Sequence, residues 1–69
     1  MIVTALEDKS FQLRVSDEEL GLIGNALNEV CNGVHIDDFE FQTRLGSERG
    51  KLQQLLTQIV TAYRSVARN

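Results

Sequence analysis

Apolar residues follow two patterns along this chain, and the change between them falls near residue 16. Before it, residues 2–6 and 11–15 are short runs rich in β-forming residues, and they flank the polar residues 7–10. This pattern predicts a β-hairpin with a four-residue connection. An isolated hairpin is marginally stable in water, so we expect it to pack on the helices of its own chain or to pair with a strand of another chain.

The first helix has a clear start. Ser16 and Glu19 have the spacing of a capping box, and Gly33 is suited to a helix C-terminus, so the pattern predicts a helix over residues 16–32. One arc of this helix is apolar and consists of Leu20, Leu22, Ile23, Ala26, Leu27, Val30 and Cys31. The opposite arc consists of Gly21, Asn25, Asn28, Glu29 and Asn32.

The next element can be interpreted in two ways. Asp37 and Glu40 indicate an N-terminal cap and Gly46 a C-terminal one, which predicts a short helix over residues 38–45. However, the apolar positions of the same segment alternate as in a half-buried strand, at Phe39, Phe41, Thr43 and Leu45. The two coincident cap signals favour the helix.

The last segment predicts a long helix over residues 48–67. An apolar stripe runs through Leu52, Leu55, Leu56, Ile59, Ala62, Tyr63 and Val66. Positions 52, 56, 59, 63 and 66 also follow heptad spacing. The stripe can therefore belong to the core of one chain or pair with a helix of a second chain.

Together these elements predict an α+β fold that is mainly α, in which an N-terminal hairpin precedes three helices within a single domain, residues 1–69. We expect a core of Leu13, Val15, Leu20, Ile23, Leu27, Val30, Phe39, Phe41, Leu45, Leu52, Leu55, Leu56, Ile59 and Tyr63.

The size of the chain makes this core small. A chain of 69 residues buries roughly 60% of its unfolded surface, and a single cysteine excludes an internal disulfide. Self-association, for example as a homodimer, would supply the missing burial. The sequence shows neither the features of a signal peptide nor an apolar run of the roughly 20 residues that span a bilayer. We therefore expect no membrane association and a cytoplasmic location.

The net charge of −3 conceals two halves of opposite sign. Residues 1–40 carry nine acidic and two basic side chains, whereas residues 41–69 carry five basic and one acidic. Either the basic half meets an anionic partner, or the two halves neutralise each other within the fold.

Candidate catalytic groups are few. Cys31 and His35 could form a thiolate pair, but Cys31 lies on the apolar arc, where a buried structural thiol is expected. Asp37 and Glu40 already serve the predicted cap. With one histidine, one cysteine and no spaced ligand pairs, we expect no enzymatic activity, no metal and no cofactor.

Two hypotheses for function follow. The first is a non-catalytic protein-interaction module that self-associates or acts as an inhibitor, since small immunity proteins share this size and acidity. Its partner would contact the asparagine-rich arc of the first helix, with Leu22 as an apolar anchor: Leu22, Asn25, Asn28, Glu29 and Asn32.

The alternative is a helix-turn-helix DNA-binding protein. The reading helix would begin near Glu48, and its early residues would face the major groove or the phosphates. Arginine and glutamine can contact guanine and adenine through two hydrogen bonds. The candidate nucleic-acid contacts are Arg44, Arg49, Lys51, Gln53 and Gln54.

Residues 25–33 (NALNEVCNG) and 39–46 (FEFQTRLG) carry a resemblance to a family. They resemble small bacterial proteins of no known activity with a core of the form ALNEV-x-NG…(F/W)E-x-x-TR-x-G. The resemblance implies that the defining positions are Asn25, Asn28, Glu29, Phe41, Thr43 and Arg44. This chain departs from the family pattern at Gly50 and Lys51, where the family would have acidic residues.

Overall fold

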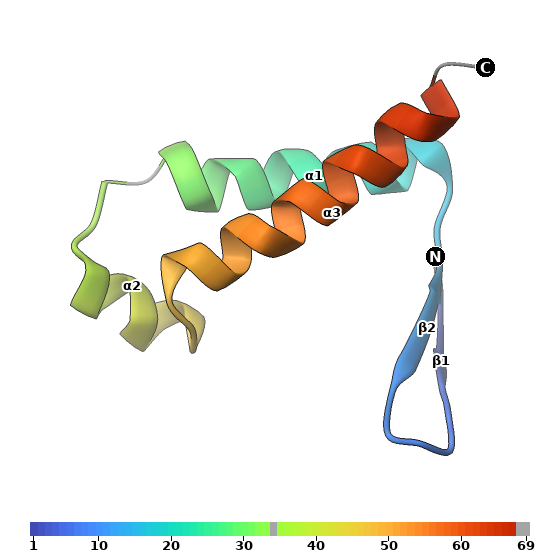
Figure 1. Ribbon diagram of the computed structural model, residues 1–69, viewed down its shortest axis with the longest axis horizontal. Coiled ribbons are helices and arrows are strands. Elements are labelled where there is room, and N and C mark those ends of the chain that lie inside the picture. Colours follow the sequence, from blue (N-terminus) through green and yellow to red (C-terminus); the bar gives the residue numbers. More distant parts are fainter. Residues whose placement is uncertain (34, 68–69) are drawn as a thin grey trace.

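The computed structural model describes residues 1–33 and 35–67 and confirms the predicted fold class. A two-stranded antiparallel hairpin precedes three α-helices (Figure 1). The elements are β1 (Ile2–Ala5), β2 (Phe11–Arg14), α1 (Asp17–Asn28), the π-helical turn η1 (Glu29–Gly33), α2 (Asp38–Leu45) and α3 (Arg49–Ala67). Residues 38–45 are therefore a helix, and the strand interpretation is wrong.

The predicted caps explain where the helices begin. Ser16 Oγ accepts from the Glu19 amide at 3.1 Å, and the Glu19 carboxylate accepts from the Ser16 amide at 3.0 Å, so both halves of the capping box are present. Asp37 accepts from the Glu40 amide at 2.7 Å and caps α2. At the other end of α2, Gly46 has a φ of 74°, a left-handed conformation that glycine adopts without steric cost.

Three helix boundaries differ from the prediction, the first because Ser16 is the N-cap and α1 itself begins at Asp17. The α-helical part of the first helix ends at Asn28, and its last turn, through Gly33, is a π-helix rather than a continuation to residue 32. A π turn carries an extra residue and is a local adjustment that hydrophobic spacing does not reveal. The last helix begins at Arg49, one residue later than predicted.

The helical part is built on α1 and α3, which lie side by side (Figure 1). A β-carbon added at Gly24 would lie 3.5 Å from Ile59, and one added at Gly21 would lie 3.3 Å from the Tyr63 ring. Small residues on α1 thus allow α3 to approach closely. Of the heptad positions of α3, Leu56, Ile59 and Tyr63 face α1 of the same chain, and the side chain of Val66 lies outside the described residues.

The core is smaller than predicted. Within the described part of the chain, the buried apolar side chains are Cys31 and Phe41. Five predicted core residues are exposed instead: Leu13, Phe39, Leu45, Leu55 and Tyr63. Residues two apart on a helix point about 200° away from each other, so Phe39 and Phe41 cannot both face α3. The other predicted core residues are half-buried.

The hairpin stands apart from the helices. Its strands pair in the register Ile2 with Arg14 through Ala5 with Phe11, and each strand is one residue shorter than expected. Among the described residues, neither strand packs against a helix, and every strand residue is exposed (Figure 1). The hairpin does not pack on the helices of its own chain, which leaves an expected partner in another chain.

Across residues 1–33 and 35–67, no helix has both the length and the apolar character required to cross a membrane.

Candidate interaction surface

The asparagine-rich arc of α1 borders a groove against α3. Asn25 and Asn28 line an open cavity of about 230 Å³, with apolar side chains of α3 on its other side. The lining residues are Leu20, Gly21, Gly24, Asn25, Asn28, Leu56, Ile59, Val60 and Tyr63. Asn28 also accepts a hydrogen bond from the Asn32 side chain at 2.8 Å, one turn further along. The groove therefore presents amide groups on an apolar floor.

The other two candidate partner-binding residues lie outside this groove. Leu22 is 61% exposed and points away from α3. Glu29 folds back over Gly33, since a β-carbon at that glycine would lie 2.5 Å from the Glu29 carboxylate. All five predicted residues are exposed, but the structure brings only Asn25 and Asn28 into one concave site, joined by Asn32 through its hydrogen bond.

Arg49 makes several contacts with the rest of the chain and is the least exposed arginine of the candidate nucleic-acid set. Its guanidinium donates to the carbonyl oxygen of Cys31 at 3.1 Å and to that of Ile36 at 2.9 Å. It also stacks over the ring of Phe41, 4.3 Å from the ring centre. The side chain is 24% exposed. Arg49 thus joins η1, the following loop and α2, a bridging role that the sequence did not signal.

The remaining basic and amide candidates are on the surface. Arg44 forms an ion pair of 2.7 Å with Glu40, one turn earlier on α2. Lys51, Gln53 and Gln54 are exposed on the first turns of α3. The three basic residues of the set therefore do not form one group of free cations. Both arginines contact acidic side chains of α2, since Arg49 also lies 3.9 Å from Asp38.

The groups considered for catalysis are separated by their environments. Cys31 is buried and His35 is exposed. Asp37 is occupied in the cap of α2. In the part of the chain that the structure describes, no three His, Cys, Asp or Glu side chains are grouped as metal ligands.

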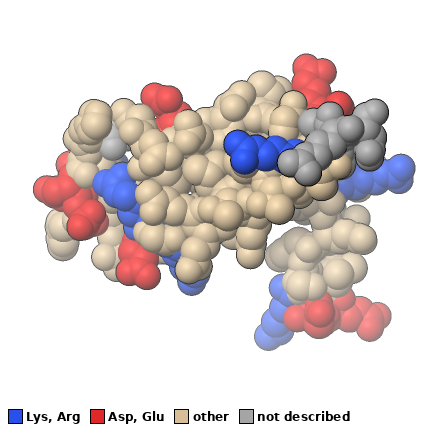
Figure 2. Space-filling view, turned by 45° about the horizontal axis from the view of Figure 1, so that its top comes forward, with Lys and Arg blue, Asp and Glu red and all other residues tan. Residues whose placement is uncertain are grey.

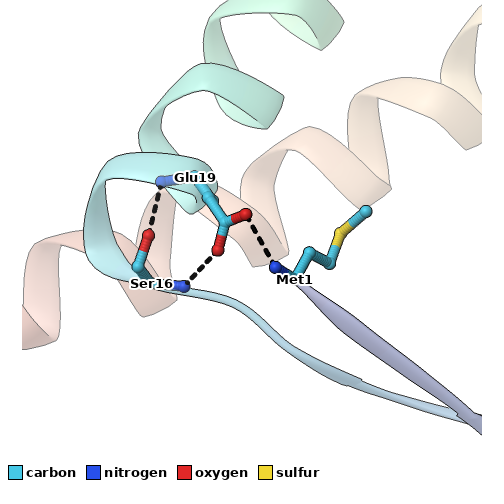
Figure 3. A network of polar contacts seen from close by, with 3 residues as sticks. All are labelled: Met1, Ser16 and Glu19. Carbon is cyan, nitrogen blue, oxygen red and sulfur yellow. Dashed lines mark hydrogen bonds and ion pairs between the residues drawn. The ribbon is translucent and has the colours of Figure 1, made fainter.

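A polar cluster of Met1, Ser16 and Glu19 joins the hairpin to α1. The Met1 amine lies 2.8 Å from Glu19 Oε2, while Glu19 Oε1 accepts from the Ser16 amide (Figure 3). These contacts, first with the amine and then with the Ser16 amide, lower the pKa of Glu19 from 4.5 to about 2. The two ends of the hairpin, at Met1 and Ser16, are thereby attached to the same turn of α1.

The hairpin carries an exposed apolar face that was not among the candidate sites predicted from the sequence. Paired residues of a hairpin share a face, so Val3 and Leu13 lie beside Ala5 and Phe11. All four are exposed. The two-residue spacing of Val3 with Ala5 and of Phe11 with Leu13 was the available signal. We call these four residues the hairpin apolar face.

Charged side chains lie mostly away from the middle of the molecule. Figure 2 shows a broad surface without charge over the helical part, with acidic and basic groups toward its ends and at the hairpin tip. Comparisons with protein-family models, with curated proteins and with solved structures found no match.

Proposed function

We propose that this chain is a non-catalytic protein-interaction module that self-associates. One observation carries the proposal: large apolar side chains that are at least 40% exposed far outnumber the two buried ones in the described part of the chain. The exposed residues are Met1, Ile2, Val3, Leu6, Phe11, Leu13, Leu22, Phe39, Leu45, Leu55 and Tyr63. Where such residues are adjacent, as in the hairpin apolar face, the exposed apolar surface is of the kind typical of binding sites.

The charge arrangement supports a protein partner more than DNA. Arg44 and Arg49 contact acids of α2, so binding a phosphate would compete with Glu40 and Asp38. Moving Arg49 to a base edge would also leave the carbonyls of Cys31 and Ile36 without that donor. A surface that must break its own ion pairs and hydrogen bonds before it can bind DNA is a poor candidate for a DNA-reading surface.

Inhibition of another protein is one specific form of this activity. Asp17 and Glu18 in the first turn of α1 offer negative charge to a basic partner, whereas the groove beside Asn25 and Asn28 offers hydrogen bonds. We retain the sequence-based expectation that the protein acts in the cytoplasm.

Sedimentation equilibrium of the untagged chain tests the proposal. We expect a mass that rises with concentration and does not change when a mixed-sequence DNA duplex is added at low salt. A chain that stays monomeric at every concentration and binds the duplex, with an affinity that falls steeply as salt rises, would favour the helix-turn-helix alternative instead.

A further inference from the structure

The two faces of the hairpin differ in character. Val3, Ala5, Phe11 and Leu13 form the hairpin apolar face, while the opposite face carries Thr4, Gln12 and Arg14, with Ile2 as its one apolar member. Phe11 is 67% and Leu13 61% exposed, although both have the side chains of core residues. A hairpin with one apolar face normally packs that face on another layer.

The helices of the same chain are not placed to supply that layer. Only Val15 and Ser16 link β2 to α1, and Ser16 is held in the capping box. The start of β1 is held as well, because the Met1 amine contacts Glu19 (Figure 3). Both ends of the hairpin are thus attached to the first turn of α1. To fold back over the helices, the hairpin would have to break this network.

The amount of exposed surface indicates how much burial is missing. The chain exposes 5818 Å². A compact monomer of its 7.8 kDa mass exposes about 4400 Å². The excess is roughly 1400 Å², more than the roughly 800 Å² that each partner buries in a standard interface. The radius of gyration, 13.8 Å, likewise exceeds the about 11 Å of a compact chain of this length.

The helical part has an apolar surface that could receive the hairpin. The groove occupies one flank of the α1–α3 pair, where Asn25 and Val60 lie. At 100° per residue, Ile23 and Ala26 on α1 and Leu55 and Ala62 on α3 lie on the other flank. Ile23 is half-buried and the other three are exposed. We call these four uncharged residues the helical flank.

We propose that the missing layer is a second copy of this chain, with the hairpin apolar face of each copy packed on the helical flank of the other. This inference rests on the proposed function and specifies its partner and surface. One chain carries both an uncovered apolar sheet face and an uncovered apolar helix flank, so a two-fold pair covers all four surfaces at once. The eight residues of the two surfaces are uncharged, and the charge next to the flank on α1 is that of Glu19, which is already paired with the Met1 amine.

Two neighbouring residues of β2 provide a matched test. Leu13→Asp places a charge on the hairpin apolar face, and Gln12→Asp places the same charge on the opposite face. Sedimentation equilibrium should show that Leu13→Asp raises the dimer dissociation constant by at least roughly tenfold, while Gln12→Asp changes it by less than about threefold. Circular dichroism reports whether the helices of each variant remain folded.

A measurement on the unmodified chain covers the case in which Leu13→Asp unfolds. In a dimer of one isotope-labelled and one unlabelled copy, filtered nuclear Overhauser spectra should connect Phe11 and Leu13 of one copy with Leu55 or Ala62 of the other.

The failures are distinguishable. If the native chain dimerises but both variants dimerise equally, or the intermolecular signals arise elsewhere, this surface is wrong and the proposed function stands. If the native chain is monomeric at every concentration, the pairing inferred here and self-association both fail.

Discussion

Arg49 and Phe41 occupy the point where the end of the first helix, α2 and the start of α3 meet. The planar guanidinium of Arg49 covers the Phe41 ring and reaches two backbone carbonyls from separate segments. Phe41 is 0% exposed, the most deeply buried side chain described. Each residue depends on the other, because the ring gives the guanidinium a surface and the guanidinium closes that side of the ring.

Replacing Arg49 by lysine should therefore destabilise the protein although the charge is kept. A lysine ammonium is a point donor that cannot span both carbonyls while stacking on the ring. We expect Arg49→Lys to lower the free energy of unfolding by about 1–3 kcal/mol, as measured by urea denaturation. Arg44→Lys is the matched control, because its ion pair is exposed, and it should cost less than about 0.5 kcal/mol. Equal effects of the two changes would show that Arg49 acts only through its charge.

The phenylalanines of α2 provide a second matched pair. Phe41→Ala removes a fully buried ring and should cost about 3–5 kcal/mol, comparable to the whole stability of a domain this small. We therefore expect loss of helical circular dichroism without denaturant. Phe39→Ala removes a ring that is 82% exposed and should change the unfolding free energy of the chain by less than about 0.5 kcal/mol. A large effect of Phe39→Ala would mean that Phe39 is covered in solution, for instance by a partner chain.

At the scale of elements, the first turn of α1 connects the hairpin to the helices. Glu19 completes the capping box with one carboxylate oxygen and contacts the Met1 amine with the other (Figure 3). The helix start and the hairpin base consequently depend on one ionised group.

This dependence predicts an acid-sensitive junction. The pKa of Glu19 is about 2 in the fold and 4.5 as its ordinary value, so the folded state favours the ionised carboxylate. Its contribution to stability is complete above pH 4.5 and is lost as the pH falls toward 2. In Glu19→Gln this part of the acid destabilisation should be absent, as measured by urea denaturation across that pH range.

Glu18→Gln is the control for that experiment, because it removes the same charge from the same helix turn without touching the Met1 amine. It should retain the acid destabilisation of the native chain. If Glu18→Gln and Glu19→Gln flatten the pH dependence equally, general charge in the first turn is responsible rather than the contact with Met1. The chain must carry no N-terminal tag, since an extension would displace that amine.

At the scale of the whole molecule, the elements spread out rather than enclose a core. The molecule measures 37 × 33 × 16 Å, and the hairpin extends from one end of the helical part (Figure 1). Its shortest dimension holds no more than two packed helices. The apolar surface that these elements display is therefore not covered within one chain.

A protein completed by its own second copy should become more stable as its concentration rises. We expect the thermal unfolding midpoint, followed by circular dichroism, to increase with protein concentration, because dimerisation stabilises the folded state by mass action. Gln12→Asp should retain this dependence and Leu13→Asp should lose it. A midpoint that is independent of concentration in the native chain would exclude a dimer that unfolds together with its subunits.

Local patterns in the sequence predicted the hairpin and the three α-helices with most of their ends, but not the π-helical turn η1. Ser16 and Glu19 lie three residues apart, and Asp37 and Gly46 nine, so local chemistry is sufficient to define the start of α1 and both ends of α2. The hairpin followed from composition and the polar segment between its strands. Four residues of the predicted polar arc, Asn25, Asn28, Glu29 and Asn32, are exposed, whereas Gly21 is half-buried beside Tyr63 of α3.

Only the tertiary structure decided which apolar side chains are covered. Phe39 and Leu55 have the same apolar character as their buried or half-buried neighbours, and only the position of the adjoining helix separates them. Arg49 became a structural bridge because it lies beside carbonyls that are 13 and 18 residues away in the chain. The start of the hairpin is likewise joined to α1 by the contact between Met1 and Glu19, 18 residues apart. Long-range contacts of this kind leave no periodic trace in the sequence, because they depend on how complete elements approach one another.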